Sequence, residues 1–283
     1  MLGSPAAIPV GGYPVTLPTS GWMLIGFLMT APRREASRDA AAAALWPEQG
    51  NEAARRCLAT TLWRTRAAFG EADCPVGAGA SSVTLRFSRG IWTDALALER
   101  RALAALQQPP PEGQARGRLR RTLLACTGEF LQGVDAEWAL LERERLRCLR
   151  LDALYALAAA YARDGAWTSV VATARPLCAA EPLREDAHRM LMLGYARSGN
   201  RGLALRQFQA CAAILAEELG VEPMEETIAL HRRLAGGGSA PAPDESRPAV
   251  PRDSPGSMRA ALLATRQSIC AALGSIDRAL ADF

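Results

Sequence analysis

The sequence has no lysine: all 33 of its basic residues are arginine, in a chain of 283 residues. Without lysine, the GxxxxGK phosphate-binding loop of many nucleotide hydrolases is excluded. Histidine is scarce as well, and neither His188 nor His231 belongs to an HExxH motif or has an obvious nucleophile partner. A GxGxxG fingerprint is also missing. We therefore predict that the chain is not an enzyme and has no catalytic residues, cofactor or metal site.

Cysteine spacing argues against disulfide and zinc chemistry. The seven cysteines are an odd number, none lies close to another, and no CxxC pair occurs. The N-terminal stretch MLGSPAAIPVGGYPV lacks the basic segment and apolar core of a signal peptide. No apolar run approaches the length of a membrane span. We expect a cytoplasmic location without membrane association.

The net charge of +4 is too small to indicate nucleic-acid binding by itself. Residues 1–100 hold 10 arginines against 8 acidic residues, and residues 101–234 hold 18 against 16. The preference for arginine over lysine fits GC-rich codons, so only the placement of the arginines carries information. With charge so evenly spread, any DNA-binding surface has to be a local patch.

The first part of the chain has the elements of a winged helix. Residues 2–18 suit short strands with a Gly-Gly turn, and the apolar stretch at 21–31 suits a buried helix. A second helix is predicted between Ser37, a candidate N-cap, and Pro47. Residues 51–69 predict a third helix. A closing hairpin is expected from strands near 82–87 and 91–93 about a Ser-Arg-Gly turn.

The third helix, NEAARRCLATTLWRTRAAF, carries an arginine cluster on one predicted face. Leu58, Leu62, Thr65 and Phe69 follow the spacing of a core-facing stripe, which leaves small residues and arginines outside. A groove-reading helix needs that combination, because small side chains let the duplex approach and arginines reach bases and phosphates. A solvated arginine face is the alternative for this helix alone. Trp63 between these residues either packs against Arg64 or a neighbouring helix, or faces the sugar-phosphate surface of the duplex, and packing is the favoured interpretation.

The hairpin favours DNA binding over a solvated face, because it places further arginines on or near a predicted wing. In a winged helix the third helix enters the major groove and the wing touches the neighbouring backbone. The predicted DNA-binding residues are Arg55, Arg56, Thr60, Arg64, Arg66, Arg86 and Arg89.

Beyond Leu96 the chain is almost wholly helical, with an internal repeat. YARDG at 161–165 recurs as YARSG at 195–199, and the offset of 34 is the period of tetratricopeptide repeats. Glu-Pro pairs at 181–182 and 222–223 are each expected to close a second helix. The Gly-, Pro- and Ser-rich residues 235–257 predict a disordered linker. Residues 258–283 predict an amphipathic helix, with apolar residues spaced by seven.

Two basic runs in the helical region are candidates for nucleic-acid patches. In ERERLRCLR (142–150), glutamates stand at spacings that allow intrahelical ion pairs, so a solvated helix face is the better interpretation. RGRLRR (116–121) is less compensated by acidic residues, and a minor phosphate-binding role stays open for it.

These motifs resemble a known family. LGSPAAIPVGGYPVTLP, SRDAAAAALWP, NEAARRCLATTLWRTRAAFG and VTLRFSRGIWTDALALE look like the OmpR-type winged helix of the Streptomyces antibiotic regulatory proteins. FLQGVDAEWALLERERLRCLRLDALYALA and ILAEELGVEPMEET look like the bacterial transcriptional activator domain of that family, a set of tetratricopeptide-like helices. The resemblance covers roughly residues 2–234.

The resemblance implies a mainly α fold, with an N-terminal winged helix (α+β) over residues 1–95 and an all-α helical-repeat domain over 96–234. It implies an activator that binds repeats in double-stranded promoter DNA by self-association and contacts the sigma and alpha subunits of RNA polymerase. By position, Arg56, Thr60, Arg64 and Arg66 match its recognition helix and Arg89 its wing. Asp94 and Leu98 match the structural junction between the two domains.

One departure from the family keeps a second function open. Family members often carry basic residues just before the first helix, where this chain has Thr19-Ser20-Gly21-Trp22. The alternative is therefore a scaffold or adaptor whose helical repeats bind a protein while the winged helix is vestigial.

Overall fold

The computed structural model describes residues 1–3, 15–70, 73–86, 93–108 and 113–236. They all belong to one compact unit, Met1–Ala240. The predicted linker, apart from Ala235 and Gly236, and the predicted helix at 258–283 lie outside the described residues. So does most of the predicted strand region at 2–18.

Three helices form the N-terminal part as the sequence predicts: α1 (Thr19–Thr30), α2 (Arg38–Leu45) and α3 (Asn51–Phe69). The hydroxyl of Ser37 accepts a hydrogen bond from the backbone N–H of Ala40 at 3.1 Å, which confirms the predicted N-cap of α2. A short 3-10 helix, η1 (Pro32–Arg34), links α1 to the first strand.

A three-stranded antiparallel sheet completes the winged helix, in the order β1-β3-β2. The strands are β1 (Glu35–Ser37), β2 (Val76–Ala78) and β3 (Ser82–Leu85). In the register, Ala36 lies opposite Val83 and Val76 opposite Leu85. Thus β3 confirms the strand predicted near 82–87, whereas β1 and β2 were not predicted. The predicted Ser-Arg-Gly turn and the start of its second strand fall in residues 87–92, outside the described part, and Thr93 serves as the N-cap of α4 rather than in a strand.

The N-terminal core is built from all these elements. Leu24 and Leu28 of α1, Leu58 of α3 and Val83 of β3 are almost completely buried in it. Trp46, at the end of α2, packs partly buried against the same core. This packing fixes the orientation of α3, because only one face of that helix can meet the core.

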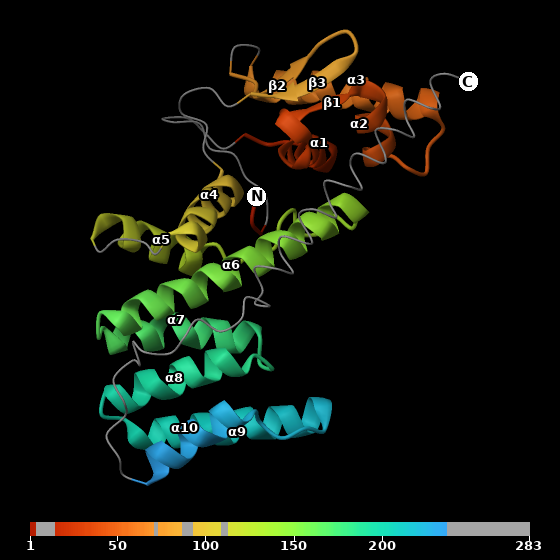
Figure 1. The fold of residues 1–283 in the computed structure, drawn as a ribbon. Helices are drawn as coiled ribbons and strands as arrows, with labels where there is room; N and C mark the ends of the chain where they lie inside the picture. The colour runs from red at the N-terminus through yellow and green to blue at the C-terminus, as the bar shows by residue number, and fades with distance from the viewer. Residues whose placement is uncertain (4–14, 71–72, 87–92, 109–112, 237–283) are drawn as a thin grey trace. The chain divides into compact units, whose positions relative to one another are not determined.

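The remaining helices are α4 (Asp94–Gln107), α5 (Gln114–Ala125), α6 (Glu137–Arg163), α7 (Trp167–Ala180), α8 (Glu185–Arg197), α9 (Arg201–Leu219) and α10 (Glu225–Ala235). Successive helices from α6 to α9 pack side by side, and α10 returns onto α8 and α9 (Figure 1). Both Glu-Pro pairs follow a helix end, that of α7 and that of α9. The fold is therefore mainly α, a winged helix followed by tetratricopeptide-like helices, as predicted.

The 34-residue repeat has a local structural cause. In each copy the helix ends at a glycine with positive φ, 71° at Gly165 and 79° at Gly199. The backbone N–H after the glycine then bonds back to the tyrosine carbonyl: Ala166 to Tyr161 at 2.9 Å, and Asn200 to Tyr195 at 2.8 Å. This is the bond pattern of a Schellman motif, which favours glycine because a side chain disfavours that backbone conformation. The repeated YAR-x-G sequence therefore specifies two equivalent helix ends.

The predicted structural role of Asp94 and Leu98 agrees with their contacts. Asp94 accepts a hydrogen bond from the backbone N–H of Leu2 at 2.9 Å and pairs with the amino group of Met1 at 2.7 Å. Leu98 is 1% exposed, in a core shared with α5, α6 and α7. Another link between the two parts comes from Trp138 of α6, whose indole N–H donates to the carbonyl of Ala44 at 3.2 Å.

Candidate nucleic-acid interface

Helix α3 has one buried face and one exposed face. Ala54, Leu58, Thr61, Leu62 and Thr65 are buried in the core, and Phe69 is half-buried. The opposite face carries Arg55, Arg56, Ala59, Thr60, Trp63, Arg64 and Ala67, all exposed. The stripe read from the sequence is therefore correct, and the residues expected on the outside face solvent.

Arg55 is engaged by a carboxylate from another helix. Its Nε lies 2.7 Å from Oδ1 of Asp39, and its Nη2 lies 2.9 Å from Oδ2, so the two side chains form a forked ion pair between α3 and α2. The hydrogen bond from Arg55 lowers the pKa of the Asp39 carboxyl, and the pKa of Arg55 is raised in turn. Both groups therefore carry full charge at neutral pH.

Arg56 forms a more local pair. Its Nη1 lies 2.6 Å from Oε1 of Glu52, one helical turn earlier, and both side chains are well exposed. Exposed pairs of this kind add at most about 1 kcal/mol to stability, so a phosphate group could replace Glu52 at little cost. Thr60 donates its hydroxyl proton to the carbonyl of Arg56 at 3.0 Å, which leaves the oxygen able to accept a further hydrogen bond.

Arg64 is exposed and Arg66 half-buried on the second half of α3, and within the described residues no ion pair engages either of them. Their guanidinium groups are thus available to an anionic ligand. Trp63 beside Arg64 is 69% exposed, so the prediction that it packs against a neighbouring element is wrong. Trp63 lies on the face of α3 that points away from the core, and no element of the described structure covers the indole.

The described hairpin, β2 and β3 with its turn at 79–81, lies near the start of α2. The backbone N–H of Arg38 donates to the backbone carbonyl of Ser81 at 2.9 Å. The Nη1 of Arg38 donates to the carbonyl of Gly79 at 3.3 Å. Arg86 follows β3 and is exposed. The guanidinium of Arg86 passes close to β2, because a Cβ placed on Gly77 would lie 3.5 Å from Nε of Arg86. Arg89 lies outside the described residues.

Sequence reasoning missed two residues of this surface, Asp39 and Arg38. Asp39 stands 16 residues before Arg55, so no helical spacing connects them, and only the packing of α2 on α3 brings them together. Glu52 was missed as well, although its spacing of four residues from Arg56 on one helix could have indicated this pair.

Within the described residues, ion pairs engage most arginines of the basic run 142–150 but only Arg116 of the run 116–121. Arg145 pairs with Glu142 at 2.6 Å and Arg147 with Glu144 at 2.8 Å, which confirms the intrahelical pairs expected for residues 142–150. In the other run, Arg116 is buried, pairs with Asp164 and lies 5.4 Å from the Tyr161 ring centroid, so it holds α5 onto α6.

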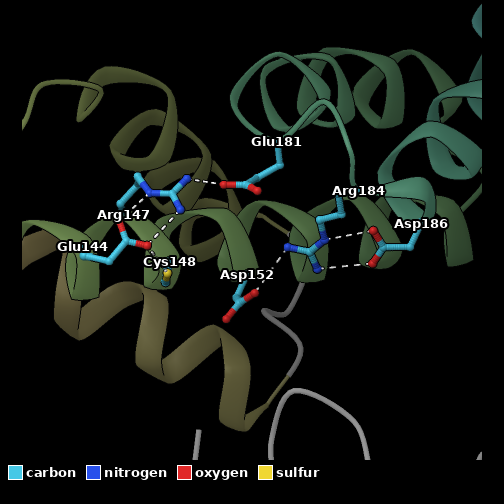
Figure 2. A network of polar contacts seen from close by, with 7 residues as sticks. All are labelled: Glu144, Arg147, Cys148, Asp152, Glu181, Arg184 and Asp186. Carbon is cyan, nitrogen blue, oxygen red and sulfur yellow. Dashed lines mark hydrogen bonds and ion pairs between the residues drawn. The ribbon is translucent and has the colours of Figure 1, made fainter. Parts of the chain in front are cut away.

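Figure 2 shows how such pairs also join α6 to the following helices. Arg147 reaches from Glu144 to Glu181 at the end of α7. Arg184 pairs with Asp186 at 2.9 Å and with Asp152 of α6 at 3.4 Å. Arg147 lowers the pKa of Glu144 to about 2 through its hydrogen bonds. Burial, followed by the hydrogen bond to Glu144, raises the pKa of Cys148 to about 11. Cys148 is therefore a neutral thiol, not a reactive one.

The described residues contain no cluster of His, Cys, Asp or Glu that could hold a metal ion. In the same part of the chain, no helix is both long and apolar enough to cross a membrane.

The fold and this surface define a class of protein, a winged helix joined to tetratricopeptide-like helices. The family model of the bacterial transcriptional activator domain matches residues 92–235, just over half of the chain. The chain therefore belongs to that family, and it is a transcriptional regulator of the Streptomyces antibiotic regulatory protein type. This is a family of regulators rather than of enzymes.

Individual relatives agree with this assignment. The regulatory protein AfsR of Streptomyces coelicolor is 31% identical over 216 residues, and the match covers 75% of this chain and 21% of AfsR. AfsR of Streptomyces griseus is 34% identical over 121 residues, 43% of this chain and 12% of that protein. The chain thus corresponds to only a fraction of the length of these relatives.

A solved structure with a similar fold is that of Mycobacterium tuberculosis EmbR in complex with a low affinity phosphopeptide. It matches with a TM-score of 0.62 and 22% identity over 85% of this chain and 65% of the EmbR chain. At that identity the likeness concerns the fold alone.

Proposed function

We propose that this regulator binds double-stranded promoter DNA through α3 and acts as a transcriptional activator in the cytoplasm. Helix α3 enters the major groove with the face that carries Arg56, Thr60 and Arg64. Arg66 and Arg86 contact phosphates beside it, and Arg89 does so from the wing. The predicted division into a DNA-binding domain over 1–95 and an activator domain over 96–234 is part of this proposal.

The observation that carries the proposal is the composition of the exposed face of α3. Ala59, Thr60 and Ala67 are exposed and have small side chains. Arg64 is exposed as well, and it takes part in no ion pair within the described residues. Such a surface suits close approach of a duplex, in which each bidentate Arg–guanine contact contributes about 1–3 kcal/mol of discrimination. The core fixes the opposite face of the helix, so the reading face is presented on a rigid element.

The helical repeats are proposed to supply the contacts with protein partners. Exposed apolar side chains gather in two places, Leu140 and Leu141 at the start of α6, and Leu219, Val221 and Met224 around the end of α9. Apolar side chains left in water are typical of protein-interaction surfaces when they are grouped. We propose that these surfaces serve self-association on repeated DNA sites and contact with the sigma or alpha subunit of RNA polymerase.

A scaffold with a vestigial winged helix is the rival function. The observation in its favour is that Asp39 and Glu52 already neutralise Arg55 and Arg56, two of the four arginines of α3. A scaffold requires no DNA binding at all, and this difference decides the experiment.

The test is a mobility-shift titration of the full chain with DNA from upstream of its own gene, across a salt series. Arg56→Ala/Arg64→Ala is compared with Arg206→Ala/Arg233→Ala, which removes the same charge from two exposed arginines of α9 and α10. We expect sequence-selective binding. The logarithm of the association constant should fall linearly with the logarithm of the salt concentration. The α3 variant loses binding and lowers the salt slope by about 1 for each phosphate contact removed, whereas the control binds as the wild type does. Absence of selective binding by the wild type, or equal loss in both variants, favours the scaffold.

A further inference from the structure

The Asp39–Arg55 pair leaves one edge of the guanidinium free. Asp39 accepts from Nε and Nη2 of Arg55, at 2.7 and 2.9 Å. A guanidinium has five N–H donors in a fixed plane. The second N–H of Nη2 and the adjacent N–H of Nη1 therefore remain side by side and form the end edge of the guanidinium, next to the edge that the carboxylate occupies. That edge has the fork geometry that binds the O6 and N7 acceptors of guanine.

Neither stability nor overall DNA affinity explains why this pair exists. The Arg55 and Asp39 side chains are 59% and 65% exposed, and exposed ion pairs contribute little to stability. A carboxylate beside the proposed DNA surface also repels phosphates and cancels one arginine charge. What the pair does provide is orientation, because a long flexible side chain is held by two parallel hydrogen bonds to a different helix.

The other ion pair of α3 lacks this geometry. Glu52 lies on the same helix as Arg56, and the pair rests on a Nη1–Oε1 contact of 2.6 Å. The contact uses Nη1, one of the two nitrogens of the end edge, so Glu52 competes with a base for Arg56 rather than orienting it. Asp39 and Glu52 thus each place one negative charge beside an arginine of α3. They differ in which edge of the guanidinium remains available to a base.

Arg55 also stands in the right part of the helix. It is in the second turn of α3, which begins at Asn51, and helix-turn-helix proteins contact base edges with the N-terminal residues of the recognition helix. Asp39 in turn lies in the first turn of α2, where its charge is favourably placed at the N-terminus of the helix dipole.

We propose that Asp39 is a positioning residue, which holds Arg55 so that its free edge reads a guanine in the major groove. This inference rests on the proposed DNA-binding function and names a determinant of its specificity. It predicts that loss of Asp39 weakens sequence discrimination although it removes a negative charge from the DNA-binding face.

The test begins with selection of duplexes from a randomised library by the wild-type full chain. Binding to the selected duplex and to a scrambled duplex of the same composition is then measured for Asp39→Asn, Arg55→Ala, Arg55→Lys and the double variant Asp39→Asn/Arg55→Ala. Glu52→Gln is the matched control. Like Asp39→Asn, it replaces the carboxylate that pairs with an arginine of α3 by a neutral amide. Each variant is also put through the selection again, which shows the base pair whose preference is lost.

We expect Asp39→Asn to lower the ratio of selected to scrambled affinity by between about 5-fold and about 150-fold, the range of a good bidentate contact. Its affinity for the scrambled duplex stays the same or rises. Arg55→Ala and Arg55→Lys relax the same base pair, and the double variant loses no more discrimination than Arg55→Ala does. Glu52→Gln keeps the preference at that base pair.

Two results would overturn the inference alone: equal tightening of both duplexes by Asp39→Asn, or relaxation of a different base pair from that affected by Arg55→Ala. If the wild type enriches no sequence from the library, the proposed function itself fails, and the inference with it.

Discussion

Thr227 of α10 donates its hydroxyl proton to Oε2 of Glu185 in α8 at 2.6 Å, and both side chains are buried. The same carboxylate accepts the backbone N–H of Met224 at 2.9 Å, immediately before α10 begins. Glu185 therefore caps the N-terminus of a helix that is remote in sequence, and it fixes the last helix of the repeat region to the stack.

Glu185→Ala should lower the free energy of unfolding by about 1–3 kcal/mol, because it leaves the Met224 N–H and the buried Thr227 hydroxyl without their acceptor. Urea unfolding followed by far-UV circular dichroism measures the change. Glu217→Ala, at an exposed position of α9, is the control and should stay within about 0.5 kcal/mol of wild type. Similar behaviour of the two variants would mean that the cap carries no stability.

Leu62 and Trp63 are neighbours with opposite surroundings, 5% and 69% exposed. Leu62→Ala opens a cavity in the N-terminal core and should cost about 2–5 kcal/mol. Trp63→Ala should cost less than about 0.5 kcal/mol, since the indole is in water. Thermal unfolding of both variants checks the pair. A large loss of stability in Trp63→Ala would show that the indole packs after all.

Gly194 of α8 packs closely against α7. A Cβ there would lie 2.9 Å from Cγ2 of Val171 and 3.2 Å from Cγ1 of Val170. Gly194→Ala should therefore destabilise the chain by about 1–3 kcal/mol through overpacking, which outweighs the gain of about 1 kcal/mol in helix propensity.

Gly202 of α9 provides the control for this substitution, because a Cβ placed on it would have no neighbour within 4 Å. Gly202→Ala should raise stability by up to about 1 kcal/mol, through helix propensity alone. Denaturant midpoints of the two variants should therefore move in opposite directions; a shift of both in the same direction would contradict the packing explanation.

Glu144 gives the repeat region an acid-sensitive contact. Its pKa falls from 4.5 to about 2 because of the hydrogen bonds from Arg147, so its contribution is present above pH 4.5 and is lost as the pH falls toward 2. The side chain is 58% exposed, and solvent screening keeps the contribution within about 1 kcal/mol. Glu144→Gln should therefore lower stability slightly at pH 7 and flatten its decline between pH 4.5 and 2.

Thermal unfolding across that pH range measures the effect. Glu222→Gln, an exposed residue between α9 and α10, changes the same functional group and should leave the slope unchanged. An unchanged slope in Glu144→Gln as well would show that Arg147 does not hold this carboxylate in solution.

Local features of the fold could be predicted from the sequence because their causes are local. The bounds of α3 follow from its continuous helical pattern between Gly50 and Gly70, and the start of α2 follows from the capping hydroxyl of Ser37. The repeat was visible because Gly165 and Gly199 end their helices with the same backbone bonds. The small strands were missed, since Glu35–Ser37 and Val76–Ala78 have little strand propensity and exist by pairing with β3.

The sequence by itself determined the three N-terminal helices, which face of α3 meets the core, and that Arg55, Arg56 and Arg64 face outward. Those properties depend on spacing along a single helix. The tertiary structure alone decided that Trp63 is exposed and that Asp39 holds Arg55. Both depend on where α2 and the core lie relative to α3, because an ion pair between helices is set by packing in space and not by distance along the chain.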